Sequence, residues 1–183
     1  MTASLDRPLI TPPLDSIATD TEALYLVSQM CLYERAYIAV EAGTYKGHGT
    51  LLLASALRAA GVNGHLWTAD PVDCGVDEYL AKNDLTAFAT YFNGDYLDML
   101  KVVPKPIDFA FIDASDHAPD SDRLMRVHHL VVTIPLMRPG GIVCLHDTGG
   151  LRGDWAGREL IRNMGGLNLR GPRGLTVLQI RDA

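Results

Sequence analysis

Short apolar runs alternate along the chain with segments in which apolar side chains recur every three or four residues. The first pattern is typical of buried strands, and the second is typical of helices that cover them. The apolar runs predict strands over residues 37–40, 64–70, 86–92, 107–112 and 142–145. The helical periodicity predicts helices over residues 20–34, 50–60, 96–102, 120–136 and 155–164, with a short helix inside 71–84. A Gly-Pro-Arg-Gly turn near the C-terminus predicts a terminal β-hairpin of residues 167–169 and 175–180.

The order of these elements predicts the fold class. Alternating β/α units build a parallel sheet covered by helices, and a terminal hairpin adds an antiparallel strand. We therefore expect an α/β protein with a mostly parallel sheet, one antiparallel edge strand, and helices on both faces. The length of 183 residues is that of one domain. Within it we expect an N-terminal arm and helix over residues 1–35 and a core over residues 36–183.

Glycines and polar residues gather in residues 41–49, between the first predicted strand and its helix. Gly43, Gly47 and Gly49 have the spacing G-x-x-x-G-x-G, whereas a dinucleotide-binding turn has G-x-G-x-x-G. In a Walker A loop the lysine follows the second glycine, whereas Lys46 precedes it here. The turn therefore departs from both phosphate-binding patterns. Gly61 follows the helix at the position of a left-handed C-cap.

Glu41 lies at the carboxyl end of the first predicted strand. A carboxylate there repels a pyrophosphate and favours a ligand with a positive charge. S-adenosylmethionine fits, because it has an ammonium group, a sulfonium and a ribose, and no phosphate. Asp70 ends the second predicted strand, where its carboxylate can accept hydrogen bonds from both ribose hydroxyls. Lys46 can offset the charge of Glu41, so a structural turn in an unrelated α/β protein stays open as the alternative.

Composition excludes several classes of function. The net charge is −6 and no lysine/arginine cluster is present, so nucleic-acid binding is not expected. We expect no signal peptide and no membrane insertion, because no apolar run is long enough. The cysteines are too widely spaced for a disulfide framework or a metal site, and indicate incidental thiols in a reducing cytosol: Cys31, Cys74 and Cys144. We expect a cytoplasmic protein, with a homodimer left open.

Several short motifs, taken in order, resemble those of a known enzyme family. They are VEAGTYKGHGT, WTAD, NGD, FIDASDH, MRPGG, LHDT and GLTVLQI. The chain resembles class I S-adenosylmethionine-dependent methyltransferases over residues 36–180. Within that class it is similar to the catechol/caffeoyl-CoA O-methyltransferase branch and its small bacterial relatives. The resemblance implies a Rossmann-like methyltransferase fold with a seven-stranded sheet, forming a single methyltransferase domain over residues 1–183.

The resemblance also implies roles for individual residues in cofactor binding. The methionine portion of S-adenosylmethionine is expected to lie against Glu41, Gly43, Thr44, Tyr45, Gly47, Gly49 and Thr50. Asp70 is expected to hold the ribose. The adenine is expected to be bordered by Gly94, Asp95 and Tyr96. Asp113 is expected near the sulfonium.

A divalent cation is a further implication of the resemblance. In metal-dependent relatives the aspartates that match Asp113 and Asp147 bind it. Two positions depart from that pattern: Thr148 replaces a metal-binding asparagine, and Asp116 replaces a catalytic lysine. Oxygens of Asp113, Asp147 and Thr148 would suit Mg²⁺, which accepts few protein ligands. Mg²⁺ is therefore a second candidate cofactor.

Three residues are candidates for catalysis. His117 and His146 can act as general base, because a histidine pKa near neutrality suits removal of a hydroxyl proton. Asp113 joins them through its position near the sulfonium. Each has a structural alternative: Asp113 can cap a turn, His117 can be an ordinary loop residue, and His146 can be a buried, hydrogen-bonded histidine.

The predicted function is transfer of a methyl group from S-adenosylmethionine to a hydroxyl of a small-molecule acceptor. An NAD-dependent oxidoreductase is one alternative, since it shares the strand–turn–helix and the acid after the second strand, but it lacks this glycine spacing. A non-catalytic scaffold that keeps the methyltransferase fold is the other, because a fold does not settle function.

Overall fold

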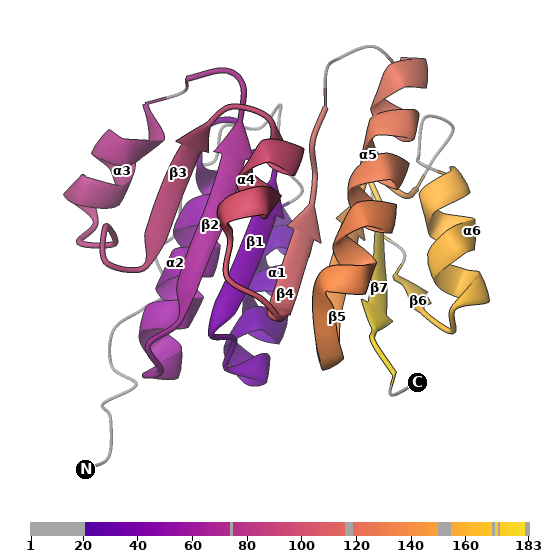
Figure 1. Ribbon diagram of the computed structural model, residues 1–183, viewed down its shortest axis with the longest axis horizontal. Coiled ribbons are helices and arrows are strands. Elements are labelled where there is room, and N and C mark those ends of the chain that lie inside the picture. The colour runs from indigo at the N-terminus through magenta and orange to yellow at the C-terminus, as the bar shows by residue number, and fades with distance from the viewer. Residues whose placement is uncertain are drawn as a thin grey trace.

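The computed structural model describes residues 21–73, 75–115, 119–149, 155–169, 171 and 173–181. Its strands are β1 (Ile38–Ala42), β2 (His65–Asp70), β3 (Ala89–Asn93), β4 (Ile107–Ile112), β5 (Met137–His146), β6 (Leu167–Leu169) and β7 (Leu175–Gln179). They form one seven-stranded sheet in the order β3-β2-β1-β4-β5-β7-β6 (Figure 1). The predicted α/β class and the number of strands in the sheet are confirmed.

The direction of the strands follows the prediction except at one edge. Neighbouring strands are parallel from β3 through β5, whereas β7 is antiparallel to both β5 and β6. The sequence predicts the antiparallel strand at the edge of the sheet, and this is wrong. The hairpin returns so that its second strand, β7, pairs with β5, and the three-residue β6 is left outside it. A short edge strand offers few unpaired backbone groups to other chains.

Helices cover both faces of the sheet. They are α1 (Thr21–Glu34), α2 (His48–Ala60), α3 (Val76–Lys82), α4 (Tyr96–Val102), α5 (Pro119–Thr133) and α6 (Trp155–Asn163). Figure 1 views the sheet from the side of α4 and α5, with α1 and α2 behind it. One apolar core joins α1, α2 and α3 to the sheet, and a second joins α4, α5 and α6 to its other face. The apolar side chains of β4 pack into both cores, and the whole strand, including Asp108, is buried.

Most predicted boundaries lie close to the observed ones. The helix of residues 96–102 and the strand of residues 107–112 are confirmed without change. Helix α2 begins at His48 rather than at residue 50, because Gly47 adopts a left-handed conformation (φ 77°) and starts the helix there. Gly61 ends it with φ 65°, as predicted. The third strand begins at Ala89 rather than at residue 86.

Strand β5 is longer than predicted. The sequence Pro139-Gly140-Gly141 predicts a turn before the strand, and this is wrong, because the strand already begins at Met137. Gly140 N donates to Ile180 O at 2.7 Å, and Ile180 N donates to Gly141 O at 2.8 Å. These bonds keep the glycines beside the C-terminal segment. Helix α5 ends at Thr133, and a 3-10 turn with Pro135 (Ile134–Leu136) completes the predicted helix of residues 120–136.

The cysteines and the lengths of the helices bear on the expected absence of disulfides and of membrane insertion. Cys31 and Cys144 are free thiols, as predicted, and both are buried, while Cys74 lies outside the described residues. Within the described ranges, no helix combines the length and apolar character that a membrane crossing requires. The predicted arm at the N-terminus also falls outside them.

Candidate active site

The acids predicted to bind the cofactor and the polar residues after β4 and β5 lie together at the carboxyl ends of the parallel strands. Glu41 is the fourth residue of β1, Asp70 ends β2, Asp113 follows β4 and His146 ends β5. Ligands of open α/β sheets bind outside the carboxyl ends of the strands, where the order of strands reverses. Here that reversal occurs at β1, which pairs with β2 on one side and β4 on the other.

The glycine turn packs directly against the loop that follows β4. Gly43 has φ 93°, and an added Cβ would lie 2.7 Å from both Asp113 O and Ala114 Cα. No side chain fits there, so only glycine lets the two loops approach this closely. Tyr45 also has a positive φ of 44°, which continues the tight turn toward helix α2.

Glu41 is buried inside this turn. It is 1% exposed, and its Oε2 accepts hydrogen bonds from Thr50 Oγ1 at 2.5 Å and Thr68 Oγ1 at 2.7 Å. Burial raises the pKa of Glu41 to about 8, although both hydrogen bonds oppose that shift. The side chain is therefore largely protonated at neutral pH when no ligand is bound. Glu41 therefore carries the full negative charge expected from the sequence only once a cation lies beside it.

A small, half-open pocket lies between the turn and β4. It is lined by Leu24, Glu41, Gly43, Thr44, Tyr45, Lys46, His48, Gly49, Phe111 and Asp113. Leu24 and Phe111 have no signal in the sequence beyond their apolar character, because both also belong to the core. Lys46 lies with its Nζ 5.6 Å from the centroid of the Tyr45 ring.

Asp70 connects the glycine turn to the loops after β2 and β3. Its Oδ2 accepts from Tyr45 N and its Oδ1 from Val72 N, each at 2.9 Å, while its carbonyl accepts from Gly94 N at 3.0 Å. A carboxylate has about four acceptor sites, so both oxygens keep room for further donors. Asp70 is only partly buried, so these sites can be reached from solvent.

The residues predicted beside the adenine divide into two kinds. Asp95 caps helix α4, where its Oδ1 accepts from Leu97 N at 2.7 Å. The Tyr96 side chain is 3% exposed, and its hydroxyl bonds Thr133 Oγ1 at 2.8 Å. The phenol of Tyr96 is thus part of the contact between α4 and α5, whereas Gly94 and Asp95 stay in the loop at the sheet edge.

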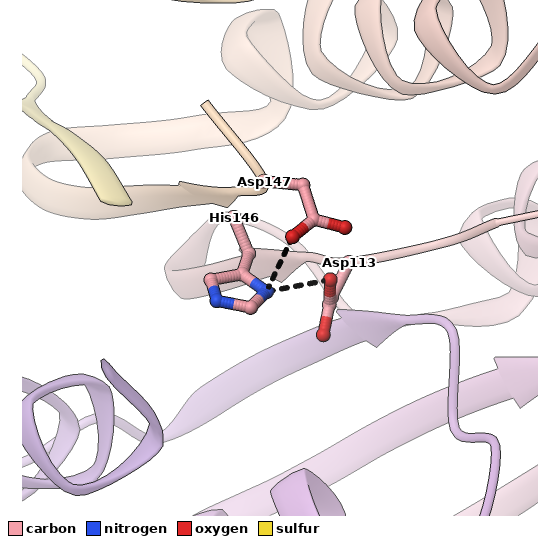
Figure 2. Close-up of side chains that lie close together, drawn as sticks. All are labelled: Asp113, His146 and Asp147. Carbon is pink, nitrogen blue, oxygen red and sulfur yellow. Dashed lines mark hydrogen bonds and ion pairs between the residues drawn. The ribbon is translucent and has the colours of Figure 1, made fainter. Parts of the chain in front are cut away.

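Asp113, His146 and Asp147 form the second part of the site (Figure 2). His146 Nδ1 lies 2.9 Å from Asp113 Oδ1 and 3.6 Å from Asp147 Oδ1. His146 is fully buried, and its Nε2 has no hydrogen-bond partner among the described residues. Burial alone would lower its pKa, but the two neighbouring carboxylates outweigh it and the pKa is raised. The predicted base candidate His117 lies outside the described residues, as does Asp116, which stands where the resemblance implies a catalytic lysine.

Two arginines that sequence reasoning did not find reach Asp147. Arg173 donates to both of its oxygens at 2.6 Å, and Arg126 Nη1 lies 3.6 Å from Oδ2. The hydroxyl of Thr148 is occupied elsewhere, because it accepts from Thr176 Oγ1 at 2.8 Å. No local sequence pattern predicts these contacts, because both arginines are far from Asp147 in the sequence.

The residues implied for a divalent cation do not fit Mg²⁺. Mg²⁺ needs oxygen ligands at short distances in near-octahedral geometry. The carboxylate of Asp147 is already engaged by a guanidinium, and the Thr148 hydroxyl is turned to Thr176. Asp113, His146 and Asp147 do place three potential ligand atoms within 4.8 Å of one another. One of the three is the imidazole nitrogen, which Mg²⁺ does not favour.

Comparisons with solved structures support the fold. The O-methyltransferase TomG of Streptomyces achromogenes, solved with S-adenosylmethionine, is 19% identical, with 92% of this chain and 83% of that chain covered (TM-score 0.69). An O-methyltransferase of Bacillus cereus in complex with SAH is 19% identical, with 88% and 82% covered (TM-score 0.67). A methyltransferase of Geobacter sulfurreducens is 14% identical, with 90% and 80% covered (TM-score 0.70).

Sequence comparison identifies the family. A search of curated proteins found no match. The family model described as "Methyltransferase domain" matches residues 40–148, which include both parts of the site. Neither the oxidoreductase nor the scaffold alternative is favoured by these matches. The chain belongs to this methyltransferase-domain family, and the predicted enzyme class, a methyltransferase with a Rossmann-like fold, is confirmed.

Proposed function

We propose that this methyltransferase takes its methyl group from S-adenosylmethionine and transfers it to a hydroxyl of a small molecule. The observation that carries this proposal is the buried Glu41 in a pocket between the glycine turn and Asp113. Glu41 can ionise, and it lies beside a tight turn whose glycine spacing departs from the phosphate-binding patterns. This combination suits a ligand that bears an ammonium group and a sulfonium. The neighbours solved with S-adenosylmethionine or SAH support the same donor.

The donor is proposed to lie along the edge of the sheet from Glu41 to Asp95. Its methionine portion would contact Glu41 and the turn residues that line the pocket. Its ribose hydroxyls would donate to the remaining acceptor sites of Asp70. Its adenine would rest against Gly94, Asp95 and the backbone of Tyr96. Thr50 acts indirectly, by donating to Glu41.

For the acceptor side we propose a base that removes the hydroxyl proton. The acceptor oxygen forms a bond to the methyl carbon, the carbon–sulfur bond breaks, and its electron pair stays on the sulfur. His146 suits the role of base, because Asp113 holds its Nδ1 at 2.9 Å and Nε2 is left as the acceptor. His117 remains the second proposal for the base. Positioning of oxygen, carbon and sulfur in line supplies much of the acceleration.

The remaining proposals concern the setting of the reaction. A small-molecule acceptor is favoured over nucleic acid by the net charge of −6, and the O-methyltransferase neighbours agree. Action in the cytoplasm, by a single domain over residues 1–183 and without a membrane partner, stays a prediction, as does a homodimer. Because the cation residues do not fit Mg²⁺, no step of the proposed reaction uses it.

Titration calorimetry with SAH tests the donor. We expect binding by the wild-type chain, a loss of about tenfold or more in Asp70→Asn, and no change in Glu78→Gln, an exposed acid on helix α3. Heat from NAD with silence toward SAH would reject the proposal. A panel of catechols, phenols and aliphatic alcohols with labelled S-adenosylmethionine then tests the acceptor. Methyl transfer to nitrogen or sulfur compounds alone would reject O-methylation.

A further inference from the structure

Asp147 is held by an arginine on the neighbouring β6–β7 loop. Arg173 donates from Nε to Oδ1 and from Nη2 to Oδ2, each at 2.6 Å. Two N–H groups on the two oxygens of one carboxylate make the strongest geometry for such a pair. Gly149 N donates to Arg173 O at 2.7 Å and Thr148 N to Gly174 O at 3.3 Å, which fastens the two loops together. The guanidinium is therefore in place before any ligand binds.

A second guanidinium approaches the same carboxylate from helix α5. Arg126 is only 3% exposed, and its Nη1 lies 3.6 Å from Asp147 Oδ2 and donates to Ala114 O at 3.2 Å. Ala114 follows Asp113, so Arg126 connects the two loops that carry the acids. Its buried Nε has no hydrogen-bond partner among the described residues. Burying an arginine this way is costly unless its charge is matched by neighbouring acids.

Among the described residues, the two carboxylates of this cluster are matched by two guanidinium groups without a metal. Asp113 and Asp147 contribute two negative charges, and Arg126 and Arg173 contribute two positive ones. A divalent cation between the carboxylates would meet two guanidinium charges at close range. It would also have to displace two N–H donors from Asp147 to gain its oxygens.

Given the proposed methyl transfer, we propose that Arg126 and Arg173 take the place of a divalent cation beside Asp113, so that the reaction needs no metal. Both are positioning residues: they hold Asp147 and the carbonyl of Ala114. Their positive charge favours the anionic oxygen that develops as the acceptor loses its proton, which is the task of the cation in metal-assisted reactions. The same charge keeps cations out of the cluster of Asp113, His146 and Asp147.

Titration of the full chain with Mn²⁺, followed by electron paramagnetic resonance in the absence of donor and acceptor, tests the exclusion. We expect no binding by the wild type at submillimolar Mn²⁺, and a gain in affinity on the order of tenfold or more in Arg173→Gln, because it frees Asp147. Arg173→Lys keeps the charge and should still exclude Mn²⁺. Arg162→Gln is the matched control, since Arg162 is exposed and pairs only with exposed Glu159 among the described contacts.

The outcomes separate this inference from the proposed function. Stoichiometric Mn²⁺ binding by the wild type, or loss of methyl transfer after EDTA treatment, would overturn it. A folded Arg173→Gln chain that gains no Mn²⁺ affinity would overturn the role of the arginine. Circular dichroism checks that this variant folds, and Arg126→Gln provides a second test of the same charge. SAH calorimetry on the same samples reports on the donor site alone, so failure there would count against the proposed function instead.

Discussion

Thr50 Oγ1 donates a hydrogen bond of 2.5 Å to Glu41 Oε2, across the glycine turn that separates β1 from helix α2. Thr68 on β2 donates to the same oxygen, so three elements meet at one buried acid. An added Cβ at Gly49 would lie 2.3 Å from the other oxygen of Glu41, which shows how closely the helix approaches it. Glu41 therefore couples the packing of the turn to the charge state of the pocket.

The first prediction concerns stability and pH. The pKa of Glu41 is raised by burial from 4.5 to about 8 in the folded chain. Between those values the folded state keeps a proton that the unfolded state has lost. The free energy of unfolding should therefore be highest below pH 4.5 with respect to this group, and should fall as pH rises toward 8, by roughly a few kcal/mol.

Urea unfolding of the wild type and Glu41→Gln from pH 5 to 9 measures this effect. Glutamine cannot ionise, so the difference in unfolding free energy between the two chains should shift in favour of the variant as pH rises. A difference that stays constant over this range would show that Glu41 ionises normally in the fold.

The second prediction concerns proton release on cofactor binding. The ammonium group of SAH beside Glu41 should lower its pKa, so SAH binds the ionised form better. Affinity should rise with pH up to about 8. Calorimetry at pH 7 in buffers of different ionisation enthalpy should reveal release of a proton, and Glu41→Gln should abolish that release. Uptake of a proton, or none in the wild type, would contradict the proposed contact.

The third prediction separates strain from close packing at two glycines. Gly43 and Gly61 both have positive φ, at 93° and 65°, but only Gly43 faces backbone atoms at 2.7 Å, while nothing lies within 4 Å of Gly61. Gly61→Ala should cost about 1 kcal/mol of stability from the backbone conformation alone. Gly43→Ala should cost about 1–3 kcal/mol and weaken SAH binding, because the loop after β4 must move. Equal losses in both variants would contradict the tight contact.

The fourth prediction distinguishes the two candidate bases. If His146 removes the acceptor proton, His146→Gln should lower kcat by about 10²–10⁴ while SAH affinity stays unchanged. His128→Gln, an exposed histidine on α5, serves as control. Retention of kcat in His146→Gln together with its loss in His117→Gln would transfer the role to His117.

Parts of the site follow from local sequence, and parts do not. Glu41, Asp70 and Asp113 each stand at or near the end of an apolar run, so the sequence places them at strand ends without further knowledge. The contacts of Asp147 depend on a helix and a hairpin that fold against it from distant positions, Arg126 and Arg173. Such long-range pairs leave no periodic signal. For the same reason, neighbouring residues in the sequence do not predict the hydrogen bond from Thr68 to Glu41.

The fold shows the same division. The segment Ile107–Ile112, apolar except at Asp108, predicts its strand because both faces of β4 are covered. Gly140 and Gly141 predict a turn, yet they lie within β5, because bonds to and from Ile180 compensate for their weak strand preference. Local sequence preference determines the secondary structure of a segment only where tertiary hydrogen bonds do not override it.

The fifth prediction concerns the end of the sheet opposite the site. Asp108 Oδ2 accepts from Tyr37 N at 2.9 Å and Ile38 N at 2.7 Å, while its Oδ1 and the carboxylate of Glu34 both accept from Arg138. Arg138→Met removes the charge shared by these two acids. Their side chains are only 10% and 13% exposed, so the loss should be about 1–3 kcal/mol in unfolding free energy.

Urea unfolding and SAH calorimetry on the same variant decide whether that ion pair acts on stability alone. SAH affinity should stay unchanged in Arg138→Met, because Asp108 lies near the start of β4 whereas the pocket lies where the strand ends. Lys101→Gln is the matched control. The side chains of Lys101 and its partner Asp98 are 72% and 59% exposed, so loss of this ion pair should leave the urea midpoint unchanged. If Arg138→Met weakened the free energy of SAH binding by as much as it lowered the free energy of unfolding, a shift at the start of β1 would also displace Glu41. The two ends of the sheet would then not be energetically separate.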